Sequence, residues 1–150
     1  MIAHPPCTYL TCAGNKWFGS KYRERFPDRI RQMEDAVIFF MEFANSSILK
    51  IAIENPIGRM SSLYRKPDQI IQPWWFGHDA RKATCLWLKN LPLLHLTCHP
   101  PVVPTIIRTR GNNTMSKWQV NCGHTNRTNR AHERSRTFPG IAEAMAEQWG

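Results

Sequence analysis

The sequence predicts an α/β fold, because stretches typical of strands and helices alternate along the chain. An apolar stretch at Ile2–His4 is typical of the end of a buried strand. A helix with one apolar face follows, and Ile48–Asn55, rich in β-branched residues, is the clearest strand in the chain. In sheets of this kind, ligands bind at the carboxyl ends of the strands. Cys7 and Glu54 are expected at two such ends, facing one cleft.

The helix between these strands is marked at both ends. Pro27 and Asp28 favour a helix start, since proline is tolerated in the first turn and a carboxylate stabilises it. The stretch Asn45-Ser46-Ser47 favours the end of the helix. Between them, apolar residues recur at helical spacing and predict one buried face, formed by Ile30, Met33, Val37, Phe40, Met41 and Ala44.

Two further strands are predicted at Gln69–Gln72 and Lys82–Leu88, on either side of a turn-like stretch at residues 73–81. Residues 57–68 are predicted to form a loop. After Leu88 the chain becomes rich in proline, and only Trp118–Val120 carries a weak strand signal. The predicted sheet therefore lies in the first part of the chain.

By length, the 150 residues form a single domain, which composition divides into segments. Residues 1–90 hold the predicted half-sheet, and residues 91–137 form a basic segment. Residues 138–150 form a C-terminal helix that begins with a proline. The apolar face of this helix is formed by Ile141, Met145 and Trp149.

The chain carries a net charge of +9, and the excess is concentrated in the basic segment. Between Cys98 and Arg136, Glu133 is the only carboxylate. Clustered cations of this kind most often contact the phosphates of nucleic acid, and the alternative is a solvated basic loop. The predicted nucleic-acid-binding residues are Arg108, Arg110, Lys117, Arg127, Arg130, Arg134 and Arg136.

The cysteines and the amino terminus predict a cytoplasmic protein. The 5 cysteines form no Cys-x-x-Cys pair, and the first residues lack the pattern of a signal peptide. No apolar stretch approaches the roughly 18–20 residues of a membrane helix. We therefore expect free thiols in a reducing compartment. A zinc site made of Cys98-His99 and Cys122-Gly123-His124 fits no common spacing, so no metal is expected.

Cys7 and Glu54 carry the predicted chemistry. Pro5-Pro6 fix the backbone ahead of Cys7, which suits a rigid loop that holds a thiolate nucleophile over a pocket. The alternative is a buried structural thiol. Glu54 lies among apolar residues, and burial is expected to favour its protonated form, which donates a proton or a hydrogen bond. The two residues form a nucleophile and a general acid.

This arrangement resembles the DNA cytosine-5 methyltransferases, whose motifs are a Pro-Cys loop after one strand and a Glu-Asn-Val turn after the next. Here the matching residues are Pro5-Pro6-Cys7 and Glu54-Asn55. Over nearly the whole chain, the stretches AHPPCTYLT, IENP, QPWWFGHDARKATCLWLK and FPGIAEAM are similar to a group of phage and prophage DNA methylase-like proteins. The resemblance implies the C-terminal half of a Rossmann-like methyltransferase sheet with a basic, irregular insertion.

The resemblance also implies a covalent mechanism on a cytosine that is flipped out of the DNA duplex. Cys7 would add to ring carbon 6 while Glu54 stabilises the protonated ring nitrogen 3. Carbon 5 would then be nucleophilic toward the methyl group of S-adenosylmethionine. A base removes the proton from carbon 5, and Cys7 leaves.

The family pattern assigns substrate contacts as well. Arg81 and Lys82 match the positions at which the family places basic residues near the cytosine and its backbone. Pro6 and Asn55 are counted with the substrate-binding residues, and Asn55 would support the loop geometry. The stretch at residues 89–136 would occupy the target-recognition position.

The sequence departs from the family pattern around both motifs. Thr8-Tyr9-Leu10 stand where the family has Gln and small residues, and Pro56 replaces Val. The glycine-rich cofactor loop, which precedes the Pro-Cys motif in the family, has no counterpart in Met1–His4. Most of the S-adenosylmethionine site is therefore expected outside this chain. Truncation of a longer protein is favoured over a second chain that supplies the other half. The chain alone is expected to be unstable or to associate, with loss of methyl transfer as one outcome.

Other interpretations stay open. His4-Pro5-Pro6-Cys7 also resembles the Asp/Asn-Pro-Pro-Tyr/Phe loop of the DNA amino-methyltransferases, which act on adenine N6 or cytosine N4. Those enzymes need neither a cysteine nor a Glu-Asn partner. A further alternative is a non-catalytic nucleic-acid-binding protein that uses the basic segment alone.

Overall fold

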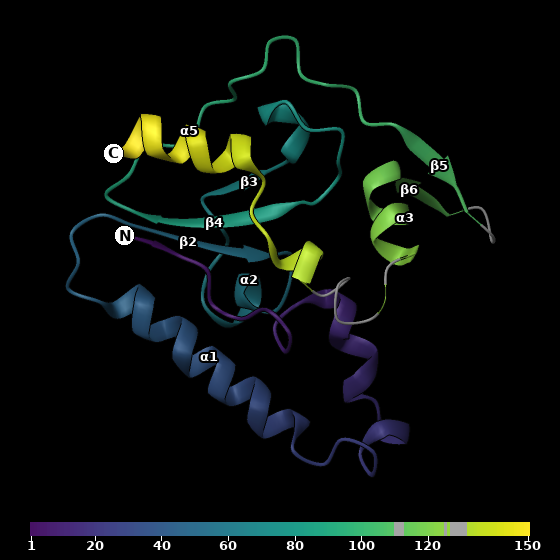
Figure 1. Cartoon of the computed structure of the whole chain (residues 1–150). Coiled ribbons are helices and arrows are strands. Elements are labelled where there is room, and N and C mark those ends of the chain that lie inside the picture. The colour runs from purple at the N-terminus through teal and green to yellow at the C-terminus, as the bar shows by residue number, and fades with distance from the viewer. Residues whose placement is uncertain (110–112, 125, 127–131) are drawn as a thin grey trace. The chain divides into compact units, whose positions relative to one another are not determined.

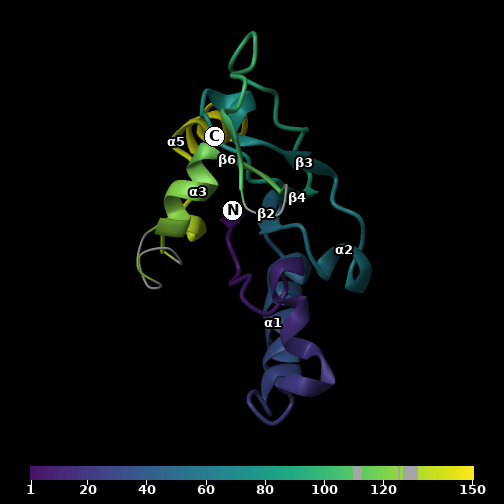
Figure 2. The same cartoon turned by 90° about the vertical axis from the view of Figure 1, so that its right-hand side faces the viewer.

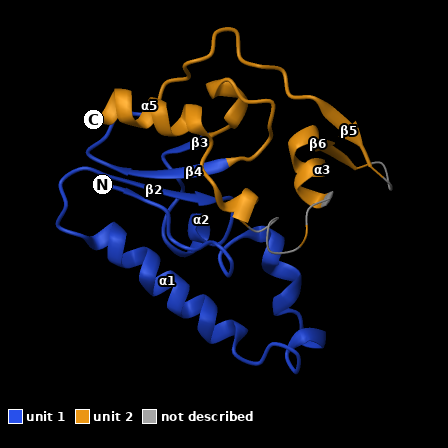
Figure 3. Ribbon diagram, viewed as in Figure 1, with its two compact units in different colours: residues 1–70, 84–93 blue, residues 71–83, 94–150 orange. Residues whose placement is uncertain are grey.

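The computed structural model describes residues 1–109, 113–124, 126 and 132–150, with the backbone alone for His124 (Figure 1). Two compact units are present (Figure 3). Unit 1 comprises residues 1–70 and 84–93, and unit 2 comprises residues 71–83 and 94–150. Among the described helices, none combines the length and the apolar character needed to cross a membrane.

A 4-stranded sheet of order β1-β2-β4-β3 runs through the first part of the chain. Its strands are β1 (Ile2–Ala3), β2 (Ile51–Pro56), β3 (Gln69–Ile71) and β4 (Thr84–Lys89). β1 is parallel to β2, and β4 is antiparallel to β2. Parallel neighbours need a long crossover, which here contains α1 (Arg29–Asn45). The predicted mixed α/β class is confirmed.

α1 packs one face against this sheet. Phe40 is fully buried and meets Trp87 of β4 edge to face, with ring centroids 5.2 Å apart. Val37, Met41 and Ala44 pack against the same core as partly buried residues. The amino-terminal end of the helix extends beyond the sheet, so Ile30, predicted on the apolar face, is 52% exposed.

The amino-terminal segment after β1 forms short turns. It contains the 3-10 turns η1 (Cys12–Phe18) and η2 (Ser20–Tyr22), which lie near the amino-terminal end of α1 (Figures 1 and 2). η1 contacts α1. Ile2 is 43% exposed because β1 is the edge strand of the sheet, so only Ala3 of the predicted buried strand is buried.

The boundaries of the second strand also differ from the prediction. β2 begins at Ile51 because Ile48 and Leu49 form an exposed bend after α1. The predicted loop at residues 57–68 contains α2 (Met60–Leu63), which is too short for a periodic sequence signal. The strands at Gln69–Ile71 and Thr84–Lys89 lie where two strands were predicted.

Unit 2 contains a small sheet and, among its described helices, α3 (Lys117–His124) and α5 (Pro139–Trp149). β5 (Ile106–Arg108) and β6 (Thr114–Ser116) form an antiparallel pair. The 3-10 turn η3 (Pro73–Phe76) contacts the C-terminal helix α5 (Pro139–Trp149). The predicted C-terminal helix is confirmed, and its buried residues are Ile141, Ala144 and Met145.

The strand predicted at Trp118–Val120 is wrong, because these residues lie in α3 (Lys117–His124). Ser116 and Gln119 explain the helix. The Ser116 N–H donates to Gln119 Oε1 at 2.9 Å, and the Gln119 N–H donates to Ser116 Oγ at 3.4 Å. This reciprocal pair is a capping box, which satisfies two of the free N–H groups of a helix start.

Candidate functional site

The parallel pairing of β1 with β2 brings the two predicted motifs together in unit 1. Ala3 lies opposite Ile53, so His4 follows opposite Glu54. Because side chains alternate along a strand, Ala3 and Ile53 share the face covered by α1, and His4 and Glu54 share the other. His4 Nδ1 accordingly lies 3.5 Å from Glu54 Oε2.

Asn55 fixes the loop that carries Cys7. Its side-chain Nδ2 donates a buried hydrogen bond of 2.9 Å to the carbonyl oxygen of Pro5. Asn55 is 2% exposed, so no water competes for this bond. The contact agrees with a loop-supporting role, and the assignment of Pro6 and Asn55 to substrate binding stays a prediction.

Cys7 is half-buried in a tightly turned loop and forms no disulfide. Its carbonyl oxygen accepts the N–H groups of both Leu10 and Thr11 at 3.0 Å. The segment after the turn is held against the chain that follows β2, because the Arg59 N–H donates to the Leu10 carbonyl at 2.8 Å. A Cβ on Gly58 would overlap that same carbonyl group, so only glycine fits there.

Glu54 lies inside β2 rather than just beyond it, because the strand continues to Pro56 opposite Thr84. Its side chain is 10% exposed, as the apolar surroundings in the sequence predict. A carboxyl group buried to this extent beside an imidazole can exchange a proton with a ring nitrogen placed against it.

Arg81 and Lys82 belong to unit 2. Arg81 has an exposed side chain, and its backbone N–H donates to Ser116 Oγ at 3.2 Å. Lys82 Nζ donates to the carbonyl oxygen of Arg136 at 2.8 Å. Their predicted place near the cytosine stays a prediction.

The predicted nucleic-acid-binding residues that the structure describes are all exposed. They are Arg108 at the end of β5, Lys117 at the start of α3, and Arg134 and Arg136 before α5. Arg136 lies 3.7 Å from Glu133, an exposed ion pair that leaves the guanidinium accessible. Arg110, Arg127 and Arg130 lie outside the described residues.

Within the described ranges, no group of three or more His, Cys, Asp and Glu residues is arranged to hold a metal. The Cys98 thiol donates to the carbonyl oxygen of Pro100 at 3.4 Å. Cys122 is buried in unit 2, and burial raises the pKa of its thiol.

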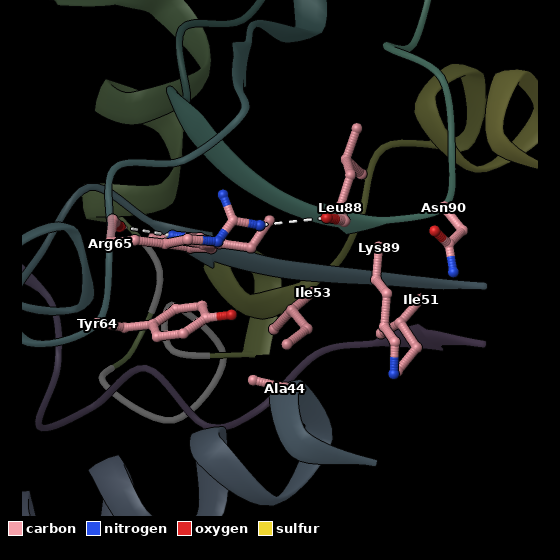
Figure 4. A pocket seen from close by; sticks show the side chains of 9 residues that line it. Ala44, Ile51, Ile53, Tyr64, Arg65, Leu88, Lys89 and Asn90 are labelled. Atoms are coloured by element: carbon pink, nitrogen blue, oxygen red, sulfur yellow. Dashed lines mark hydrogen bonds between the residues drawn. The ribbon is translucent and has the colours of Figure 1, made fainter. Parts of the chain in front are cut away.

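A pocket of about 290 Å³ lies in unit 1 and includes Ile51 at the start of β2 and Lys89 at the end of β4 (Figure 4). It is lined by Ala44, Ile51, Ile53, Tyr64, Arg65, Trp87, Leu88, Lys89 and Asn90. Its cations are engaged in the fold: Arg65 donates to Asp68 at 2.8 and 2.7 Å, and Lys89 Nζ donates to the Ser46 carbonyl at 2.7 Å. The pocket therefore reflects how the 65–68 turn is attached to β4.

The described residues do not fit S-adenosylmethionine. The turn after β1 starts with Pro5-Pro6, which offers no N–H donors. Gly58 lies against the backbone carbonyl of Leu10, and Gly140 lies against that of Phe76. A Cβ at either glycine would overlap that carbonyl. These glycines serve the fold of the protein itself and leave no cradle for a nucleoside.

Sequence reasoning missed side chains around the site. The register of β1 against β2 brings His4 beside Glu54. A parallel pairing of the two predicted strands would have indicated this position. Arg29 and Arg59, far apart in the sequence, meet at the ring of Phe18 in the segment after Cys7. No sequence signal indicates that contact.

Neither the known protein-family models nor the curated protein sequences match this chain.

Proposed function

We propose that this chain is the catalytic half of a DNA cytosine-5 methyltransferase, with Cys7 as the nucleophile and Glu54 as the acid. One observation carries the proposal. The parallel register of β1 and β2 brings the Pro5–Cys7 loop beside Glu54-Asn55, and the Asn55–Pro5 hydrogen bond of 2.9 Å fixes it there. Each motif alone is short, but their convergence at one edge of a sheet is what the chemistry needs.

The sheet supports a Rossmann-like methyltransferase half. β1, α1 and β2 form a strand–helix–strand unit with parallel strands, and β4 joins it antiparallel. Doubly wound folds often carry an antiparallel strand at the edge of a parallel sheet, whereas here β4 lies inside the sheet and β1 is at its edge. In doubly wound folds, ligands bind at the carboxyl ends of the parallel strands, which is where the Cys7 loop leaves β1.

The proposed chemistry uses the residues of this chain as follows. The Cys7 thiolate forms a bond to carbon 6 of a flipped cytosine, and the electrons of the 5,6 double bond move through the ring toward nitrogen 3. Glu54 delivers its proton to nitrogen 3, so no negative charge builds up on the ring. The product is an enamine that is nucleophilic at carbon 5. Reversal expels Cys7 and returns the proton to Glu54.

S-adenosylmethionine is the proposed source of the methyl group. Because the described residues do not fit it, we propose that residues outside them hold it. DNA is the proposed partner, supported by the exposed cations Arg108, Lys117, Arg134 and Arg136. The 5 free cysteines support a reducing compartment, the cytoplasm.

Hydrogen exchange at carbon 5 of cytosine tests the nucleophile without a methyl donor. Addition of a thiolate to carbon 6 lets carbon 5 take deuterium from D2O, and reversal leaves the label in the DNA. A pool of random-sequence duplexes is incubated with the chain, and the released deoxycytidine is analysed by mass spectrometry.

We expect the wild-type chain to promote exchange and Cys7→Ser to abolish it. Cys12→Ser is the matched control, because Cys12 is an exposed free thiol in the next turn of the chain. Glu54→Gln should slow exchange by roughly 10²–10⁴-fold, the usual contribution of a general acid. Exchange that survives in Cys7→Ser, or that is absent from the wild type, overturns the proposal.

A further inference from the structure

We propose that Arg29 and Arg59 form a phosphate-binding site in unit 1, which takes a phosphodiester group of the nucleic acid beside the Cys7 loop. The choice of nucleic acid rests on the proposed function, whereas phosphate binding itself does not. This site is separate from the basic residues of unit 2, which are the predicted nucleic-acid contacts.

The two guanidinium groups converge on one aromatic ring. The guanidinium carbons of Arg29 and Arg59 lie 4.9 and 4.2 Å from the ring centroid of Phe18. Arg29 also lies 5.2 Å from the ring of Tyr9 and 5.9 Å from that of Phe26. At these distances the ring faces attract the guanidinium cations without using their N–H donors.

No counter-charge reaches this pair within the described part of the chain. The Nε atoms of Arg29 and Arg59 are both buried without a hydrogen-bond partner, and neither side chain takes part in an ion pair there. A polar group buried without a partner is destabilising, and two like charges at one ring repel each other. An anion between them would relieve both costs.

The position of Arg29 adds a second, independent argument. It is the first residue of α1, a 17-residue helix whose amino-terminal end carries partial positive charge. A cation there is disfavoured and an anion is favoured. The adjacent carboxylate, Asp28, lies 3.3 Å from Arg31 and makes no side-chain cap on the helix. The amino-terminal end of α1 and the two guanidinium groups therefore all contribute positive charge at this site.

The site lies on the segment that Cys7 begins. Arg29 covers the ring of Tyr9, two residues after Cys7, and its Nη2 would lie 3.2 Å from a Cβ on Gly14. The backbone of Arg59 is bonded to the Leu10 carbonyl. A phosphate held here would neighbour the loop that is proposed to attack the base. The planar guanidinium fork matches a phosphate with paired hydrogen bonds.

Two measurements test the inference on the full chain. In the first, the Arg Nε–H signals of the wild type are followed by NMR while inorganic phosphate or a cytosine-containing duplex is added. In the second, the salt dependence of duplex binding is measured for Arg29→Gln and Arg59→Gln. Arg31→Gln is the matched control, because Arg31 is 70% exposed in the same helix turn and already faces Asp28.

We expect phosphate and duplex to shift the Nε–H signals of Arg29 and Arg59 together. We expect each Gln variant to reduce the slope of log K against log salt by about 0.9, the value of one phosphate contact, and the control to leave it unchanged. If circular dichroism shows that a Gln variant is unfolded, the NMR titration of the wild type alone tests the phosphate site. Unshifted Nε–H signals, or unchanged slopes in folded variants, overturn the inference.

The outcomes separate this inference from the proposed function. If both Gln variants bind the duplex with an unchanged slope of log K against log salt, the phosphate site is refuted and the proposed function is unaffected. If inorganic phosphate shifts the Nε–H signals of Arg29 and Arg59 but the chain does not bind DNA, the anion site is supported and DNA is excluded as the substrate. A purely structural stacking of arginines on Phe18 predicts no response to either ligand.

Discussion

The side-chain amide of Asn55 donates a 2.9 Å hydrogen bond to the carbonyl oxygen of Pro5, 50 positions earlier in the chain. The bond is buried, and it joins the loop that leaves β1 to the end of β2. Cys7 lies two residues beyond one end of it, and Glu54 is the residue before the other. The geometry of the candidate site therefore depends on a contact between residues that are not themselves reactive.

Asn55→Ala should destabilise unit 1 and loosen the Cys7 loop. Removal of the amide leaves the Pro5 carbonyl buried without this donor, which costs about 1–3 kcal/mol of the free energy of unfolding. Urea unfolding measures the change, with exposed Asn15 as the control: Asn15→Ala should shift the free energy by less than about 0.5 kcal/mol. Equal effects of the two variants would contradict the loop-supporting role.

Gly58→Ala should be destabilising because the Leu10 carbonyl occupies the space of its Cβ. The backbone must shift, which typically costs about 1–3 kcal/mol. Gly123→Ala is the control, since nothing lies within 4 Å of its Cβ position and it sits in α3. That change should stabilise the helix by up to about 1 kcal/mol. Thermal unfolding of both variants decides, and a neutral Gly58→Ala would show that the contact is absent.

The Asp68 carboxylate should stabilise unit 1 at neutral pH and not in acid. Burial opposes its ionisation, but hydrogen bonds from Arg65 and the Leu88 N–H outweigh this and hold its pKa below the usual value of 3.8. Its contribution is present above that value and is lost as pH falls through the lower folded-state pKa.

Asp68→Asn should therefore lower the free energy of unfolding by about 1 kcal/mol at pH 7, and the difference should vanish at low pH. Denaturant unfolding across this pH range is the measurement. Asp28→Asn, at a carboxylate that is 62% exposed, should have a small effect throughout. A difference between wild type and Asp68→Asn that persists in acid would argue against an ionic contribution.

Cys85 should make the protein less stable in alkali. Burial raises the pKa of its thiol from 9.0 to about 11. As the pH rises above 9.0, the Cys85 thiol of the unfolded chain loses its proton while that of the folded chain keeps it. The free energy of unfolding therefore falls as the pH rises from 9.0 to about 11. This decline should shrink in Cys85→Ala and persist in Cys12→Ala, because Cys12 is exposed. Identical alkaline declines in both variants would refute the assignment.

Long periodic segments of this chain were predictable, and short ones were not. The helical spacing before Asn45 predicts α1, and Pro139 with its apolar face predicts α5. β2 and β4 follow from β-branched and apolar runs. α3 was mistaken for a strand because its few apolar residues have no clear period, whereas the capping pair Ser116 and Gln119 was the informative signal.

The candidate site was predictable only in part. The motifs gave Cys7 and Glu54, and the parallel pairing that joins their strands follows from an α/β fold. The contact of His4 with Glu54 depends on register, which a two-residue strand does not specify in sequence. The meeting of Arg29 and Arg59 at Phe18 depends on the path of the 3-10 turns and leaves no pattern in the sequence.

The most direct test of the account is covalent capture of a reactive base by Cys7. A duplex that carries pyrimidin-2-one in place of cytosine lacks the 4-amino group and is more electrophilic at carbon 6. We predict an adduct with the wild-type chain and with Cys12→Ser that survives denaturation, maps by peptide mass spectrometry to Cys7, and is absent from Cys7→Ser. An adduct on another cysteine, or none with the wild type, would contradict the account.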